Sequence, residues 1–183
     1  MQWVYFGLLG LVLIIAAVVD LRRHIVPNRL TIPAICLGLM LHGADGLVHN
    51  GAEGLADGLI VAFGAMLVGL IPMAIVFFAG GLGGGDVKLV AAIGAITGSW
   101  KCVLAAAFYG FVFAAIIALF LMFRHRIVKR TLQRILGAAL TAYGRSKPEI
   151  PTDSPKVPFA LALCFGGLLA AVEHLLVVSL PWS

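Results

Sequence analysis

Long apolar runs constrain this chain more than any other feature of its sequence. A helix needs about 20 mostly apolar residues to cross the hydrocarbon core of a bilayer. Apolar runs of this kind recur at about 2–19, 30–48, 55–79, 87–99, 102–123 and 158–180. This spacing predicts an all-α integral membrane protein, a single domain over residues 1–183 built as a bundle of about six transmembrane helices. The fourth run is short, so we expect protein to shield it from lipid.

Composition excludes a soluble domain. The 183 residues are 62% hydrophobic and only 11% charged, with a mean hydropathy of +1.09, whereas soluble domains have about 25% charged residues. The formal net charge of +5 does not indicate nucleic acid, because most basic residues flank apolar runs, where they orient helices against anionic headgroups. Three widely spaced cysteines form no CxxC pair, so we expect no metal site and no cofactor.

The distribution of basic residues predicts the topology. No Lys or Arg precedes the run at 2–19, as a signal peptide would require, so we expect a retained first span with its N-terminus outside. Twelve of the 13 Lys and Arg residues lie in three segments, at 20–29, 80–88 and 124–157. The segment at 42–54 has none. The positive-inside rule then predicts cytoplasmic loops at the three basic segments, an external loop at 42–54, and both termini outside.

The segment from Arg124 to Tyr143 has apolar residues at helical spacing, with Arg and Lys at the other positions. This pattern predicts a basic amphipathic helix on the inner leaflet, before the last span. A plain cytoplasmic extension of the fifth span is the alternative.

Two acidic residues are the strongest candidates for chemistry. By the predicted topology, Asp20 ends the first span and Asp86 opens the fourth, so both lie at the cytoplasmic membrane boundary although they are 66 positions apart. Two carboxylates that meet share a proton, and such a pair activates water for attack on a peptide carbonyl without a metal or a covalent intermediate. The alternative is that each aspartate caps a helix N-terminus or pairs with an arginine.

Five glycines closely precede Asp86 in the stretch "FFAGGLGGGDVKLVAA". Because glycine lacks a Cβ, residues such as Gly83 and Gly85 allow positive φ angles and close approach of a substrate strand. We therefore expect an extended peptide to bind beside Asp86. The alternative is a flexible linker between spans.

Three further residues flank the two aspartates. Pro27 suits the first turn of the second span, with Asn28 beside it, which predicts a short connection after Asp20. Lys88 has several candidate partners, among them Asp86, a substrate carbonyl and a lipid headgroup. Side chains two positions apart on a helix point in different directions, which argues against an ion pair between Lys88 and Asp86. No role is assigned to Glu173 or His174, inside the last apolar run.

These residues resemble a known family. "GGGDVKL", Gly83 to Leu89, is similar to the GxGD signature of the type IV prepilin peptidases, which are intramembrane aspartic proteases. "DLRRHIVPNRLT", Asp20 to Thr31, resembles their first aspartate segment, and "KVPFALAL", Lys156 to Leu163, resembles the start of their final span. The resemblance implies that Asp20 and Asp86 are catalytic. It also implies cleavage of the short basic leader of prepilins or pseudopilins at the cytoplasmic face.

The resemblance further implies a bacterial inner membrane location and a short form of the enzyme, similar to the peptidases of tight-adherence (Flp-type) pilus systems. Longer members add an N-terminal segment, often with two CxxC pairs, and N-methylate the product. We expect no N-methyltransferase activity here, since no CxxC pair is present. Archaeal preflagellin peptidases are a nearby alternative. From other classes, the alternatives are a proton-coupled transporter and a non-catalytic membrane subunit of a pilus or secretion system.

Overall fold

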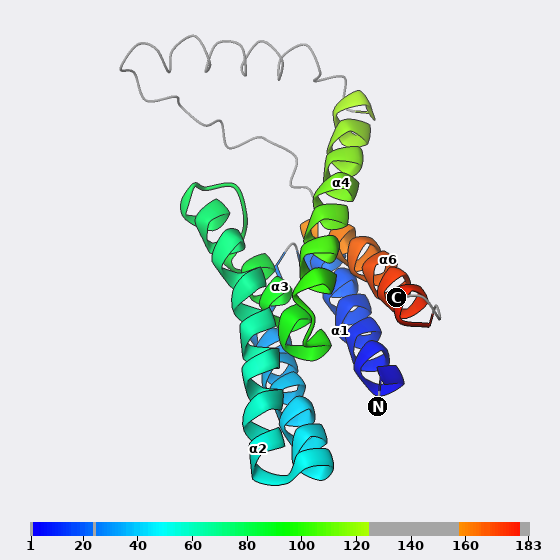
Figure 1. The fold of residues 1–183 in the computed structure, drawn as a ribbon. Helices are drawn as coiled ribbons and strands as arrows, with labels where there is room; N and C mark the ends of the chain where they lie inside the picture. The colour runs from blue at the N-terminus through cyan, green and yellow to red at the C-terminus, as the bar shows by residue number, and fades with distance from the viewer. Residues whose placement is uncertain (1, 24, 125–157, 180–183) are drawn as a thin grey trace, which may run out of the picture. The chain divides into compact units, whose positions relative to one another are not determined.

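The computed structural model describes residues 2–23, 25–124 and 158–179, and these are helical with short connections and no strand. Five helices are present in the described residues (Figure 1): α1 (Gln2–Arg23), α2 (Asn28–Phe78), α3 (Gly84–Thr97), α4 (Trp100–Arg124) and α6 (Phe159–Ser179). The predicted all-α class is confirmed.

The chain divides into two compact units, Met1–Ala114 with Pro158–Ser183, and Ala115–Val157. The first unit holds every feature discussed below. Most of the predicted basic helix at 124–143 and of the predicted loop at 124–157 lies outside the described residues. The prediction of one domain over residues 1–183 stays a prediction.

Two of the predicted spans are arms of one bent helix, α2. Only Asn50 (φ −132°, ψ 16°) and Gly51 (φ 65°, ψ −146°) leave helical geometry, and the chain reverses there. A positive φ at Gly51 suits glycine, which has no Cβ to clash. The prediction of a loop at 42–54 is therefore wrong, because both arms continue into this segment as helix and satisfy their backbone hydrogen bonds internally. Its external location stays a prediction. We call residues 28–49 the first arm and residues 52–78 the second arm.

Glycines bring the two arms of α2 together. A Cβ added at Gly46 would overlap the carbonyl of Gly54, and one added at Gly58 would overlap the carbonyl of His42. Small residues allow helix backbones to approach closely in membranes, where apolar burial alone gives little drive for helix association. The bend therefore holds the arms as a tight antiparallel pair (Figure 1).

Helix α3 packs against both arms. A Cβ added at Gly38 would lie 2.6 Å from the carbonyl O of Ala95, and one at Gly94 would lie 2.5 Å from the carbonyl O of Ala65. The helix has 14 residues, and its residues 89–96 are all buried. This agrees with the prediction of a short fourth run shielded by protein.

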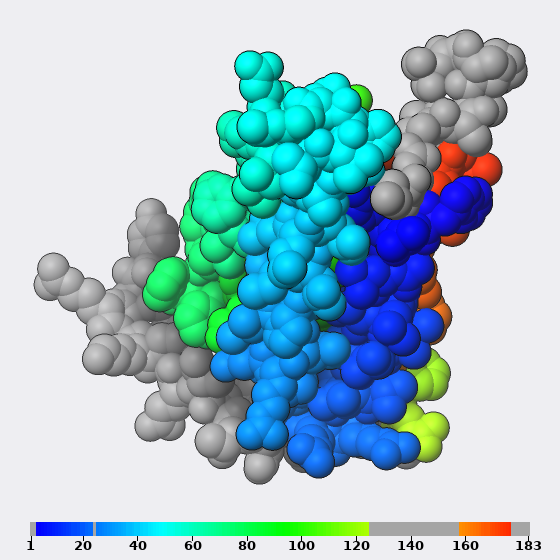
Figure 2. Space-filling view, turned by 90° about the horizontal axis from the view of Figure 1, so that it is seen from below, coloured from blue at the N-terminus to red at the C-terminus, as the bar shows by residue number. Residues whose placement is uncertain are grey.

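The other helices pack beside this core. α1 contacts α6, α3 and α2; Figure 2 shows the first arm of α2 lying along α1, where Tyr5 stacks on His42 with ring centroids 4.4 Å apart. α4 meets α6 where a Cβ on Gly166 would overlap the backbone N of Gly110. Four helices, α1, α2, α4 and α6, are long and apolar enough to cross a membrane. The chain is thus built as a membrane protein, while the count of six spans remains a prediction.

The helices define two ends of the first unit. The aspartate end contains the C-terminus of α1 and the N-termini of α2, α3 and α6. The opposite end contains the start of α1, the bend of α2, the N-terminus of α4 and the end of α6. The start of α1 and the end of α6 therefore lie at the same end (Figure 1).

Candidate active site

Asp20 lies in the last turn of α1, which continues without a break to Arg23. The predicted loop at 20–29 is therefore wrong at its start, and it is also wrong at its end, because α2 begins at Asn28. The side chain is only 6% exposed, and in the part of the chain that the structure describes Asp20 is the one charged residue that is buried. A carboxylate in such a position needs polar partners.

The N-terminus of α6 supplies one partner. The backbone N–H of Ala160 donates a 3.0 Å hydrogen bond to Oδ2 of Asp20. N–H groups in the first turn of a helix have no partner within the helix, and the helix dipole makes this end positive. Sequence reasoning singled out residues 156–163 but missed this contact. Pro158 before an apolar run was the available signal, since it marks a helix start with unpaired N–H groups.

Asp86 lies in the first turn of α3. The predicted loop at 80–88 is therefore wrong from Gly84 onward, where this helix begins. Its Oδ2 accepts a 3.3 Å hydrogen bond from the N–H of Gly83, the residue that precedes the helix. Both aspartates thus bind a helix N-terminus, as the alternative interpretation proposed. Capping and pairing are compatible, because a carboxylate offers about four lone-pair sites on two oxygens.

The two aspartates interact electrostatically across 66 positions of sequence. Asp86 lies outside the four helices that can cross a membrane. Burial, and then the negative charge of Asp20, raise the pKa of Asp86 to about 6, while the hydrogen bond from Gly83 acts in the opposite direction. Two carboxylates coupled in this way titrate as a unit and tend to hold one proton between them. The structure therefore brings together the two residues that the sequence singled out.

The glycines before Asp86 matter mainly because neighbouring atoms lie close to where their Cβ atoms would be. A Cβ added at Gly85 would lie 2.8 Å from the carbonyl O of Val26, and one at Gly83 would lie 3.1 Å from Oδ2 of Asp86. The expected positive φ occurs in this loop only at Gly80 (φ 80°). That part of the prediction is wrong for Gly83 and Gly85. The missing side chain of Gly85 instead lets the start of α3 touch the connection between α1 and α2, and that of Gly83 leaves room for the carboxylate of Asp86.

Lys88 links α3 to the start of α2. Its Nζ donates a 2.8 Å hydrogen bond to Oδ1 of Asn28, and no ion pair joins Lys88 to Asp86 in the described structure. Pro27 precedes the helix by one residue, with φ −75° and ψ 140°, instead of lying in its first turn. Its carbonyl accepts the N–H of Leu30 at 3.0 Å. Asn28, Pro27 and Lys88 thus hold the two helix starts beside Asp86.

Comparison with known families matches residues 7–144 to the type IV leader peptidase family. The chain belongs to this family. The match includes Asp20 and Asp86 but ends before the segment at 156–163 that carries the third similarity.

The prepilin peptidase EppA of Methanothermobacter thermautotrophicus is 40% identical over 74 residues, which are 40% of this chain. The matched part of the chain spans only 18% of the length of that relative. No solved structure matches the chain.

Proposed function

We propose that the chain is a membrane-embedded aspartic endopeptidase that removes the short basic leader of type IV prepilins or pseudopilins. One observation carries the proposal: Asp20 of α1 and Asp86 of α3 interact at one end of the bundle, in a chain of the type IV leader peptidase family. A carboxylate pair with one shared proton suits hydrolysis of a peptide bond.

The environments of the two carboxylates suggest their roles. The N–H of Ala160 and the positive end of α6 favour a negative charge on Asp20, so Asp20 is the base that takes a proton from water. Burial favours the protonated form of Asp86, so Asp86 is the acid that donates its proton to the carbonyl oxygen as the water oxygen attacks the carbonyl carbon.

The tetrahedral intermediate then collapses. Asp86 takes back its proton from the oxygen, and the C–N bond breaks as Asp20 gives the proton from water to the leaving nitrogen. The products are a carboxylic acid and an amine, and the pair returns to its starting state. In this scheme an extended substrate lies beside Asp86. Gly85 lets the start of α3 lie close to Val26, Gly83 leaves room for the carboxylate of Asp86, and Pro27, Asn28 and Lys88 support the site.

The surroundings suggest how the substrate approaches. Large apolar side chains are exposed at the aspartate end, among them Leu21, Ile25 and Phe78, which are at least half exposed. We propose that the hydrophobic helix of the substrate lies in lipid beside them while its leader reaches the two aspartates. Arg22 and Arg23, in the last turn of α1, suggest that this end faces the cytoplasm.

The remaining expectations belong to the same proposal. They are a location in the bacterial inner membrane, a role in pilus assembly or protein secretion, no cofactor, and no N-methylation of the new terminus. The mass of the mature pilin tests the last of these, since methylation adds a CH₂ unit to the product.

The test is co-expression of the full chain with a candidate prepilin, followed by the mobility shift of leader removal. We expect cleavage by the wild type and by Asp57→Asn, which changes an exposed acid on the second arm of α2. We expect none with Asp20→Asn or Asp86→Asn, because an amide serves neither as the acid nor as the base. Unchanged cleavage by either variant would overturn the mechanism. Pilus assembly that survives both substitutions would instead favour a non-catalytic subunit.

A further inference from the structure

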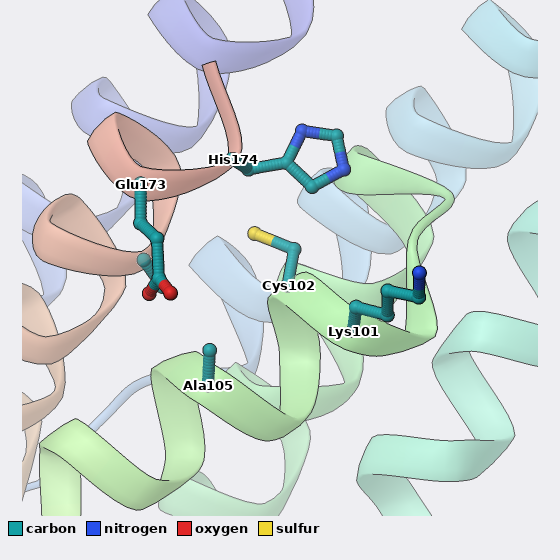
Figure 3. Close-up of a pocket in the computed structure, with 6 residues that line it drawn as sticks. Lys101, Cys102, Ala105, Glu173 and His174 are labelled. Carbon is teal, nitrogen blue, oxygen red and sulfur yellow. The ribbon is translucent and has the colours of Figure 1, made fainter. Parts of the chain in front are cut away.

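A second cluster of polar groups lies at the opposite end of the bundle, away from the aspartates. Glu173 is 13 residues beyond Ala160 on α6, which corresponds to about 20 Å of helix. The cluster surrounds a cavity of about 130 Å³, enough for several waters or one small polar group. Figure 3 shows the cavity, which is lined by Lys101, Cys102, Ala105, Ala170, Glu173 and His174. The proposed peptidase mechanism uses none of these residues.

Two opposite charges line this cavity without pairing. Among the described residues the one ion pair joins His49 to Asp45, so Lys101 and Glu173 do not form a salt bridge. The hydroxyl of Tyr109 donates a 2.8 Å hydrogen bond to Oε2 of Glu173 and holds the carboxylate in place. Figure 3 shows Nζ of Lys101 turned away from this carboxylate. Each charge therefore has room for a counter-charge from outside the protein.

The cavity has a fixed frame. The imidazole Nε2 of His174 lies 3.1 Å from Oγ of Ser99, and the same Oγ accepts the N–H of Cys102 at 3.4 Å. These contacts join α6 to the start of α4, and the bond between Tyr109 and Glu173 joins the same helices further along α4. A preformed site loses less freedom when a ligand binds.

Exposed tryptophans indicate the depth of the cavity in the membrane. Trp100 is 56% exposed and Trp3 is 79% exposed, and both lie at this end of the bundle. Nζ of Lys101 lies 5.8 Å from the centroid of the Trp100 ring. Tryptophan is enriched where lipid headgroups meet water. The two tryptophans therefore favour a position at headgroup level for the carboxylate of Glu173 and the ammonium of Lys101.

We infer that this cavity binds the headgroup of a phosphatidylethanolamine lipid. The primary ammonium donates hydrogen bonds to Glu173, and the phosphate accepts from Lys101 at the rim. One headgroup thereby carries a counter-charge for each of the two side chains. Phosphatidylcholine carries the same phosphate, but its quaternary ammonium has no N–H to donate. Phosphatidylglycerol has no ammonium at all, so the chemistry of the site favours the ethanolamine lipid.

Native mass spectrometry of the full chain in detergent, with each of the three lipids added at equal concentration, tests this site. A charge-assisted hydrogen bond from the ammonium predicts about tenfold tighter binding of phosphatidylethanolamine than of phosphatidylcholine. We expect phosphatidylethanolamine and phosphatidylcholine to bind Glu173→Gln with equal affinity, since this substitution removes the negative charge that binds the ammonium. Lys101→Gln weakens both lipids, because it removes the contact to the shared phosphate.

Glu53→Gln is the matched control, because it changes an exposed acid of α2 that does not line the cavity. We expect it to leave the preference unchanged. Equal binding of the three lipids by the wild type would overturn the inference, because the site would then not distinguish the primary ammonium. A preference that survives Glu173→Gln would overturn it as well. The comparison of the three lipids on the wild type needs no variant and no peptidase activity. Its result therefore tests the lipid site whether or not the proposed peptidase function is correct.

Discussion

Ala160 donates its backbone N–H to Asp20 across 140 positions of sequence, at 3.0 Å and away from water. This contact ties the end of α1 to the start of α6. It also places a positive helix terminus against one of the two carboxylates of the candidate active site. Asp20 therefore has a structural role in addition to its proposed catalytic one, and substitutions can separate the two.

Asp20→Asn and Asp20→Ala separate these roles. We expect both to abolish leader cleavage, because neither side chain accepts a proton from water. The amide keeps a carbonyl oxygen for the N–H of Ala160, whereas alanine leaves that buried donor without a partner, at a cost of about 1–3 kcal/mol. Thermal unfolding in detergent should therefore show a lower midpoint for the alanine variant than for the asparagine variant. Equal midpoints would mean that the contact with Ala160 contributes nothing to stability.

Gly85→Ala should destabilise the protein and slow cleavage. The new Cβ would lie 2.8 Å from the carbonyl O of Val26, so the start of α3 must move away from the connection between α1 and α2. Crowding of this kind costs about 1–3 kcal/mol. Unfolding midpoints and initial cleavage rates measure the effect.

Gly84→Ala is the matched control for this loop, because its Cβ would make an ordinary 3.5 Å contact with the ring of Phe77. We expect this variant to stay near wild type in stability and in rate. If both substitutions had the same effect, loss of glycine flexibility would be the better explanation than contact with Val26.

Lys88→Met and Asn28→Ala should act through the same contact. Both remove the 2.8 Å hydrogen bond between α3 and the start of α2, so the double variant should be little worse than either single one. We expect a coupling of about 1 kcal/mol in a double-mutant cycle on stability, with a parallel fall in cleavage rate. Arg29→Gln, which removes an exposed neighbouring charge, is the control and should leave both measurements unchanged. Additive effects would show that Lys88 and Asn28 act independently.

Cleavage should depend on pH through Asp86. The mechanism needs the proton on Asp86, whose pKa is raised to about 6, so the initial rate should fall by about tenfold per pH unit above that value. Rates on purified protein in detergent, measured on both sides of this pH, provide the test. A rate that stays level on both sides would contradict the assigned role.

The same proton should make stability depend on pH. The folded protein binds it more tightly than the unfolded chain, whose aspartate has a pKa near 3.8, so this contribution is full below that value. It is lost as the pH rises through about 6. Asp86→Asn should abolish this part of the pH dependence of the unfolding midpoint.

Much of the architecture could be predicted from the sequence, because apolar runs and the positions of charged residues are local properties. The runs predicted where helices form, and the depth of Asp20 and Asp86 predicted that they meet. The glycines around Asp86 indicated close approach, although they did not indicate that Val26 is the neighbour. The bend at Asn50 and Gly51 escaped prediction, since the polar residues around it look like a loop while their backbone stays helical.

Sequence alone thus determined a helical membrane protein with two aspartates at one depth, because hydrophobicity and charge act residue by residue. Only the tertiary structure decided that Asp20 contacts the N–H of Ala160, whereas the contact of Asp86 with the N–H of Gly83 is local to the start of α3. It also decided that Lys88 binds Asn28 and that Glu173 faces a cavity shared with Lys101. The physical reason is that these contacts join residues far apart in the chain, so they depend on how the helices pack at their glycines, and the contact with Asp20 also satisfies an N–H that the start of α6 leaves without a partner.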